Sequence, residues 1–205
     1  MADEKEKSRT IVTPEFRLAF PEVFVPKAAP NSTREVYSIN MLFDKTADLK
    51  NLRLLLRDAI IAKWGEDQSK WPAVLGKAKL ATAVGIKGWP IRDGDEVTWP
   101  GYPGNLFARA STTFQPQVID RAKNEILDKN AIFGGLLCRA AVNAFAYDNS
   151  GNKGVSLGLS ILQVLKDDGT RYGGGRPDVN KVFGDDDWAD PSAGMDAGPG
   201  SDEGF

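Results

Sequence analysis

The chain has 205 residues, enough for one domain with a substantial core, and a formal net charge of −2. It contains no histidine and one cysteine, which excludes structural zinc and removes the residue most used for acid–base catalysis near neutral pH. No apolar run reaches the ~18 residues of a membrane helix, and the charged N-terminal residues lack the apolar segment of a secretory signal.

The small net charge hides an uneven distribution along the chain. No Lys or Arg follows Lys181, and residues 184–205 hold seven of the 28 acids. Residues 1–183 therefore hold 21 acids and 26 bases, a net charge of +5. We expect a basic, polyanion-binding domain over residues 1–183, with residues 1–9 mobile, followed by an acidic, disordered tail over residues 184–205.

The first predicted elements are two strands. Residues 11–20 alternate in polarity, with Phe20 on the apolar face and Arg17 on the other. The three prolines within residues 21–30 predict an extended connector. Residues 35–43 alternate again and predict the second strand.

A change to helical spacing predicts one helix over residues 44–64, packed on the sheet with its charges outward. Thr46 or Asp48 is placed to cap its start, and Gly65 is placed to end it.

Residues 71–103 are rich in Gly and Pro and predict mainly loops, with short β segments near residues 79–86. Among its aromatic residues we single out Trp89 as a binding residue, because Lys87 and Arg92 flank it. The alternative stays open, because loop aromatics often serve as anchors against a core.

A third strand is predicted over residues 105–113, with Phe107 and Arg109 on one face and small apolar residues on the other. Residues 116–130 follow as a loop or a short helical turn.

The longest regular pattern is a β-hairpin over residues 136–165, with a turn at residues 148–154. Its first strand has a small-residue face that includes Cys138, which we interpret as a buried, inert thiol. The opposite face carries Arg139, Phe145 and Tyr147.

Aromatic rings that stack on bases and cations that contact phosphates are the residues that bind single-stranded nucleic acid. This combination occurs on two predicted strands, so we predict one open surface. Its members are Phe107, Arg109, Arg139, Phe145 and Tyr147, with Arg17, Lys87, Trp89 and Lys153 at the rim. In the alternative, these rings lie beneath a loop or the helix and the arginines pair with carboxylates.

Catalytic motifs are weak. Asp93, Asp95 and Glu96 form a carboxylate cluster of the kind that a Mg²⁺-dependent nuclease would need. The pattern of these residues, however, predicts a turn between short strands. Residues 172–176 are Gly-rich but lack the strand–loop–helix context of a phosphate loop. We predict no catalytic residues, no metal and no cofactor.

The acidic tail ends in Asp202, Glu203 and Phe205. An anionic segment tethered to a cationic groove competes with nucleic acid at high local concentration. We expect the tail to be released when the groove is filled, so that its terminal Phe docks into a basic, apolar pocket of a partner. A tail that only aids solubility is the alternative.

The chain resembles the OB-fold single-stranded DNA-binding proteins of tailed bacteriophages. The similar stretches are TPEFRLAFPEVFVPK (residues 13–27), YSINMLFDK (37–45), RDGDE (92–96) and AFAYDNSGNKGVSLGLSILQVLKDDG (144–169). Acidic tails that end in Phe also occur in cellular and T7-like single-stranded DNA-binding proteins. In this chain the predicted helix follows the second strand, whereas a standard OB barrel has it after the third.

The resemblance implies a mainly β fold, a five-stranded OB-like barrel with one long helix and long loops. It also implies a protein without enzymatic activity that coats single-stranded DNA during phage replication or recombination, in the host cytoplasm. Replication or recombination proteins are the expected partners of the tail, no membrane is involved, and a homodimer stays open. A structural or adaptor protein without a nucleic-acid ligand is the second hypothesis.

Overall fold

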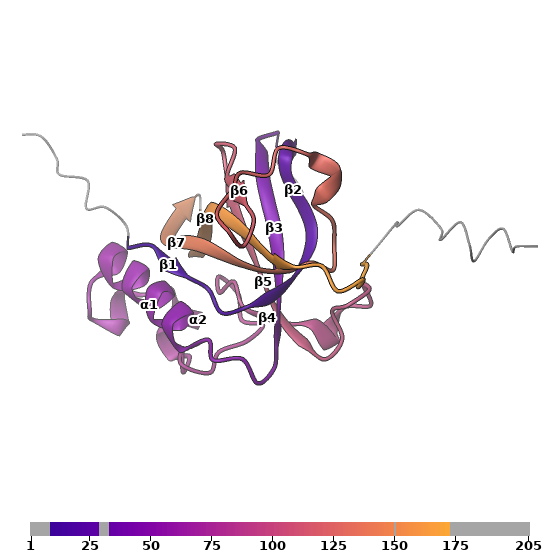
Figure 1. Cartoon of the computed structure of the whole chain (residues 1–205). Helices are drawn as coiled ribbons and strands as arrows, with labels where there is room; N and C mark the ends of the chain where they lie inside the picture. Colours follow the sequence, from indigo (N-terminus) through magenta and orange to yellow (C-terminus); the bar gives the residue numbers. More distant parts are fainter. Residues whose placement is uncertain (1–8, 29–32, 150, 173–205) are drawn as a thin grey trace, which may run out of the picture. The chain divides into compact units, whose positions relative to one another are not determined.

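The computed structural model describes residues 9–28, 33–149 and 151–172. The described part is mainly β, as expected, with one long helix beside a set of curved strands (Figure 1). None of its helices has the length and apolar character needed to cross a bilayer.

Five strands form a closed ring. They are β2 (Phe16–Ala28), β3 (Glu35–Asp44), β5 (Asn105–Thr112), β8 (Asn152–Lys166) and β7 (Leu137–Asn149), in that order around the ring. The β5–β8 pair is parallel and the others are antiparallel. The ring closes because β7 pairs with both β8 and β2. This order agrees with the predicted five-stranded OB-like fold.

Three short strands extend the sheet at its margins. Strand β1 (Ile11–Val12) pairs with β7, and β4 (Arg92–Asp93) pairs with β5. Strand β6 (Gln117–Ile119) lies parallel to β8, inside the stretch that the sequence predicted as a loop or helical turn. That prediction was incomplete, because the partner that fixes β6 comes some forty residues later in the chain.

The predicted hairpin is confirmed as β7 and β8, which pair from Leu137 and Lys166 to Asn149 and Asn152. Cys138 lies on the inner face of β7 with no exposed surface, and burial raises the pKa of its thiol to about 12. It is therefore the inert, buried thiol that its neighbours predicted.

Helix α1 (Lys50–Trp64) covers the strands β1, β7 and β8 (Figure 1). It buries Leu52, Leu55, Leu56 and Ile60. Before the helix, Asp48 Oδ1 accepts a hydrogen bond from the backbone N–H of Lys50. Gly65, at φ 82°, ends the helix as predicted, and its N–H donates to the carbonyl of Ile61.

Shorter elements connect these parts. They are the helix α2 (Ala73–Lys77) and 3₁₀ turns η1 (Gln68–Lys70), η2 (Gly94–Glu96) and η3 (Lys129–Ala131). Residues 79–86 contain no strand, so the predicted β segments there are wrong. These residues instead form turns and bends, and Leu80, Ala83, Val84 and Ile86 pack on the main core.

The connector predicted over residues 21–30 is also wrong where the structure describes it. Strand β2 continues through Pro21 and Pro26 to Ala28. Its pairing with β3 shifts register between Ala19 and Glu22 and again before Lys27. Because proline cannot donate a ladder hydrogen bond, the strand keeps its path only by these irregularities.

The described part has two apolar clusters. The main core fills the ring and the space beneath α1. A small second cluster lies on the outer face and joins Ala19, Leu42 and Phe107 on three neighbouring strands with the loop residue Tyr102. This outer cluster fixes a loop against the strands and so shapes the site described next.

Candidate nucleic-acid interface

A groove of about 730 Å³ runs over the outer face of the ring. Its floor is the outer face of β2, β3 and β5, and residues of β7 and β8 line one end. The other wall comes from the loops around residues 88–92 and Trp99. Since strand residues alternate in direction, the apolar core and this polar surface use alternate positions of the same strands.

Two open aromatic rings stand in the groove. Phe20 is 53% exposed and Trp99 is 48% exposed, and their ring centroids are 5.7 Å apart at an interplanar angle of 79°. Trp99 also packs edge-on against the buried Tyr102, at 5.2 Å. The phenol oxygen of Tyr102 accepts a hydrogen bond of 2.6 Å from Asn40 Nδ2 on β3. A fixed tyrosine thus holds an exposed tryptophan in place.

The outward position of Phe20 comes from a backbone irregularity. Phe20 has a φ of 44°, which bulky residues rarely adopt, and it lies where the β2–β3 register shifts. The next residue, Pro21, has no N–H to lose from the ladder. The shift moves Phe20 from the predicted core face to the groove, and strain of this kind is typical of functional sites.

Cations lie beside these rings. Arg92 and Arg109 both line the groove, are exposed, and form no ion pair within the described ranges. Arg109 Nη2 donates a hydrogen bond of 3.1 Å to Ser38 Oγ, which leaves most of its donors free. The groove carboxylate Glu22 is paired with Lys27 at 2.8 Å. The groove therefore carries a positive excess.

One loop is fixed against the hairpin by close backbone contact. The N–H of Val155 donates to the carbonyl of Gly88 at 2.9 Å. Gly88 has a φ of 81°, and a Cβ there would approach the carbonyl oxygen of Lys153 to 2.7 Å. Only glycine fits both constraints.

This fixed loop buries Trp89. Its side chain is 2% exposed and its indole N–H donates to the carbonyl of Ala83 at 3.1 Å. Trp89 borders the groove, but its burial leaves no free face for a base. Trp89 therefore anchors its loop against the core, which was the alternative to a binding residue in the sequence analysis.

Besides the buried Trp89, the structure brings three of the predicted residues into the groove lining: Phe107, Arg109 and Tyr147. Phe107 is 8% exposed because Tyr102 packs edge-on over it, with ring centroids 4.9 Å apart. It supports the surface from below and does not present an open ring. Tyr147 is half-buried at the end of the groove.

Three further predicted residues lie beside the groove. Phe145 is 48% exposed on β7 and stands opposite Ser156, which lines the groove. Lys153 is paired with Asp148 at 2.9 Å. Lys87 is exposed and precedes Gly88, one of the lining residues.

Two predicted arginines are engaged elsewhere. Arg139 is exposed, but its Nε donates to Gln163 Oε1 at 2.7 Å, and it lies six residues, roughly 20 Å, from Phe145 along β7. Arg17 Nη1 donates to Asp168 Oδ1 at 2.9 Å and to the carbonyl of Gly135 at 3.0 Å. The hydrogen bonds from Arg17 hold the pKa of Asp168 well below its usual range.

The carboxylates considered for metal chemistry are occupied by protein donors. Lys45 forms ion pairs with both Asp93 and Asp95. Asp93 also accepts from the N–H of Asp95, and Asp95 accepts from the N–H of Gly104. These donors lower the pKa of both carboxyl groups. Across residues 9–28, 33–149 and 151–172, no group of three or more His, Cys, Asp or Glu side chains is placed to hold a metal ion.

The tail residues Asp202, Glu203 and Phe205 lie outside the described residues, and so does the Gly-rich stretch after Tyr172. Sequence reasoning missed Phe20, Trp99 and Asn40 as groove residues. For the two tryptophans the sequence holds no local signal that separates them, because each follows a small residue, Gly88 or Thr98, and precedes a proline.

Comparison with known proteins gives a consistent result. The family model described as "Enterobacter phage Enc34, ssDNA-binding protein" matches residues 9–192. A relative from Acyrthosiphon pisum secondary endosymbiont phage 1, named "Putative protein p50", is 30% identical over 168 residues. That alignment covers 80% of this chain and 88% of the relative.

Solved structures share the fold. The single-stranded DNA-binding protein of bacteriophage Enc34 is similar at a TM-score of 0.61 and 20% identity, over 85% of this chain and 89% of that one. The same phage protein in complex with ssDNA gives a TM-score of 0.58 and 20% identity, over 78% and 87%. The gp2.5 single-stranded DNA-binding protein of bacteriophage T7 gives 0.54 at 12% identity, over 89% and 99%.

The Arg17–Asp168 pair predicts an acid-sensitive contribution to stability. Because the folded-state pKa of Asp168 is lowered, the pair stabilises the fold above the ordinary carboxyl pKa near ~4, and the contribution is lost as the pH falls below it. Asp168→Asn should lower the unfolding midpoint at pH 7, and the difference from the parent should shrink below about pH 4. Thermal unfolding between pH 2 and 7 measures both.

Asp58→Asn is the matched control, because Asp58 forms a more exposed, 3.4 Å pair with Arg9. It should change the midpoint little at any pH. A constant difference between Asp168→Asn and the parent across the pH range would contradict the assignment.

Proposed function

The chain belongs to the family of the single-stranded DNA-binding protein of Enterobacter phage Enc34, and we propose that it binds single-stranded DNA in the groove over β2, β3 and β5. The observation that carries this proposal is the pair of open rings, Phe20 and Trp99, beside Arg92 and Arg109, which form no ion pair with any residue that the structure describes. Open rings stack on bases of any sequence, and cations follow the phosphates.

Stacking on Phe20 and Trp99 supplies the sequence-tolerant part of the affinity. Each stacked base contributes ~1–3 kcal/mol. Asn40 and Tyr102 keep Trp99 oriented, so little side-chain freedom is lost when a base binds.

The phosphate path uses Arg92 and Arg109 first. Lys87 and Lys153 lie beside the groove and extend the path toward the hairpin, where the exposed ring of Phe145 offers a further stacking surface. Arg139 and Arg17 have fewer donors left for phosphates, since Gln163 and Asp168 bind their guanidinium groups.

The biological role proposed is to coat single-stranded DNA during phage replication or recombination, in the cytoplasm of the bacterial host. The protein acts by binding and not by catalysis. The hydrogen bonds that occupy Asp93 and Asp95 support this view over a Mg²⁺-dependent nuclease.

The acidic tail regulates binding. We assign residues 1–183 to the binding domain and residues 184–205 to the tail, whose seven acids compete with DNA for the groove. Release of the tail by DNA frees Asp202, Glu203 and Phe205 to recruit replication or recombination proteins. The chain can also form a homodimer in this proposal, and the mass measured by sedimentation would test it.

Trp99→Ala should weaken binding of a short oligonucleotide by about 5- to 150-fold, because it removes one stacked base. Fluorescence anisotropy with a labelled oligo(dT) measures the effect. Phe114→Ala is the control, because Phe114 is 82% exposed and does not line the groove. Equal affinity of the Trp99→Ala and Phe114→Ala variants would contradict stacking of a base on Trp99. If the parent protein does not bind DNA at all, the adaptor hypothesis is favoured.

Arg109→Ala should change the salt dependence. Loss of one phosphate contact lowers the slope of log affinity against log salt by about 0.7 for a single strand. Titrations at several salt concentrations give the slope. Lys63→Ala, an exposed cation of α1 outside the groove, should leave it unchanged. A parallel loss of affinity at every salt concentration would instead indicate a role for Arg109 without phosphate contact.

Removal of residues 184–205 should tighten DNA binding at low salt, and the gain should fade as salt screens the tail. The control keeps the tail length and replaces each Asp and Glu by Asn and Gln, which should reproduce the gain. Weaker binding of either variant would refute competition by the tail.

A further inference from the structure

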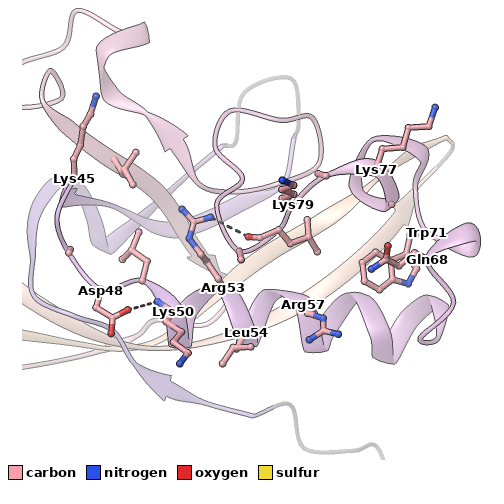
Figure 2. Close-up of a pocket in the computed structure, with 17 residues that line it drawn as sticks. Lys45, Asp48, Lys50, Arg53, Leu54, Arg57, Gln68, Trp71, Lys77 and Lys79 are labelled. Atoms are coloured by element: carbon pink, nitrogen blue, oxygen red, sulfur yellow. Dashed lines mark hydrogen bonds between the residues drawn. The ribbon is translucent and has the colours of Figure 1, made fainter.

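A second cleft of about 790 Å³ lies beside α1 and does not share lining residues with the DNA groove. Its walls are the start and middle of α1 and the segment from Gly76 to Ala81. Figure 2 shows Lys45 and Lys77 at opposite ends of this cleft and Arg53 extending from α1 toward the segment of Lys79. The cationic lining residues are Lys45, Lys50, Arg53, Arg57, Lys77 and Lys79.

Most of these cations lack a carboxylate partner. Lys45 is paired with Asp93 and Asp95, but the other five form no ion pair within the described residues. Arg53 is partly buried and donates only to the carbonyls of Leu80 and Ala83, and burial lowers its pKa. The single acid in the lining is Asp48, which accepts from the N–H of Lys50.

The arrangement is electrostatically unfavourable in the absence of a ligand. Lys50, Arg53 and Arg57 follow the three- and four-residue spacing that brings like charges together on one helix face. Lys50 also begins the helix, where the macrodipole disfavours a cation, and the first turn contains no acid. A bound anion would relieve both effects.

The lining indicates what kind of anion fits. The cleft has an apolar part that includes Leu49, Leu54 and Leu80. Its one ring, Trp71, is 6% exposed and donates its indole N–H to the carbonyl of Gly65, so no ring is open for stacking on a base. Cations around an apolar floor favour an acidic peptide with an apolar anchor over a nucleic-acid strand.

Two carboxylates, Asp93 and Asp95, lie between this cleft and the DNA groove. Arg92 lines the groove, the next residue Asp93 and then Asp95 pair with Lys45, and Lys45 lines the cleft. A DNA strand that continued from one site to the other would pass this acidic pair, which disfavours a shared phosphate path.

The chain itself contains a segment of the required chemistry. Residues 184–205 hold seven acids and no base, and they end in Phe205. The 33 residues after Tyr172 can span at most about 120 Å, which is ample for reaching a neighbour. The last described residues lie on the side of the ring away from α1 (Figure 1).

We propose that the α1 cleft of one copy binds the C-terminal segment, residues 184–205, of a second copy. This inference rests on the proposed function, in which DNA displaces the tail from the groove. The released tail then links neighbouring copies on one strand: its carboxylates contact Lys50, Arg57 and Lys77, and Phe205 enters the apolar part. The link makes coating of long strands cooperative.

The direct test uses a labelled peptide of residues 184–205 and the full chain, with a short oligonucleotide filling the groove. Anisotropy at low salt should show saturable binding, weakened at least tenfold by the triple variant Lys50→Glu, Arg57→Glu and Lys77→Glu. The matched control, Lys63→Glu, Lys129→Glu and Lys166→Glu, makes the same charge change at exposed sites outside the cleft. A peptide with Phe205→Ala should also bind less tightly. Equal loss in both triple variants would reduce the effect to net charge and overturn the proposal.

The second arm measures binding to short and long single strands. The cleft variant should bind a short oligonucleotide like the matched control, but lose cooperativity on a long strand. If the parent binds the peptide but the cleft variant keeps the cooperativity of the parent on a long strand, the tail occupies the cleft of its own copy. This result would refute the link between neighbouring copies. A loss of short-oligonucleotide affinity specific to the cleft variant would identify DNA as the occupant. Failure of the parent to bind DNA would reject the proposed function alone, because repeating the peptide titration without the oligonucleotide still compares the cleft variant with its matched control.

Discussion

The architecture depends on one short seam, where β2 pairs with β7 and turns the sheet into a ring. Only Phe16 with Cys138 and Arg17 with Leu137 are register partners there. Leu18 and Gly135 add backbone hydrogen bonds, and Arg17 ties the seam to Asp168 after β8. Without this closure, β2 would have one partner strand fewer and the inner face would lose its apolar enclosure. Arg17, which the sequence analysis places at the rim of the DNA surface, is thus also part of the ring closure.

The groove follows from the same closure. In a closed ring the inward positions are filled with apolar side chains, so the outward positions are the surface available for a ligand. Across β3 and β5 these outward positions pair as Asn40 with Arg109 and Leu42 with Phe107. Tyr102 packs on Leu42 and Phe107, and Trp99 packs in turn on Tyr102. The irregular strand β2 adds Phe20, whose ring also contacts Tyr102. A small outer core thus holds the aromatic platform that regular alternation alone would not produce.

Local patterns predicted much of this fold. Period-two alternation was enough for the hairpin, for β3 and for β5. Helical spacing with Gly65 was enough for the body and the end of α1, but the predicted start was wrong, because the helix begins at Lys50 and its N-cap, Leu49, forms no side-chain cap hydrogen bond. The other failures share a cause, which is dependence on distant partners. Strand β6 exists through its pairing with β8, and β2 passes two prolines because β3 accommodates register shifts. At the site, alternation placed Arg109 correctly on the outer face. The burial of Trp89 depends on how its loop packs against Gly154 and Val155, and the exposure of Trp99 depends on how another loop packs through Tyr102. No local pattern contains that information.

The seam also contains the one cysteine of the chain. Cys138 faces Phe16 across the β2–β7 pair and has no exposed surface. Alkylating reagents need an accessible thiolate, so they can modify Cys138 only in molecules whose ring has opened. Cys138 is therefore a natural reporter of ring opening. When the ring recloses much faster than the thiol reacts, the alkylation rate of Cys138 divided by the alkylation rate of a free thiol gives the fraction of molecules with an open ring. No engineered label is needed, since the reporter already lies at the place where the sheet joins itself.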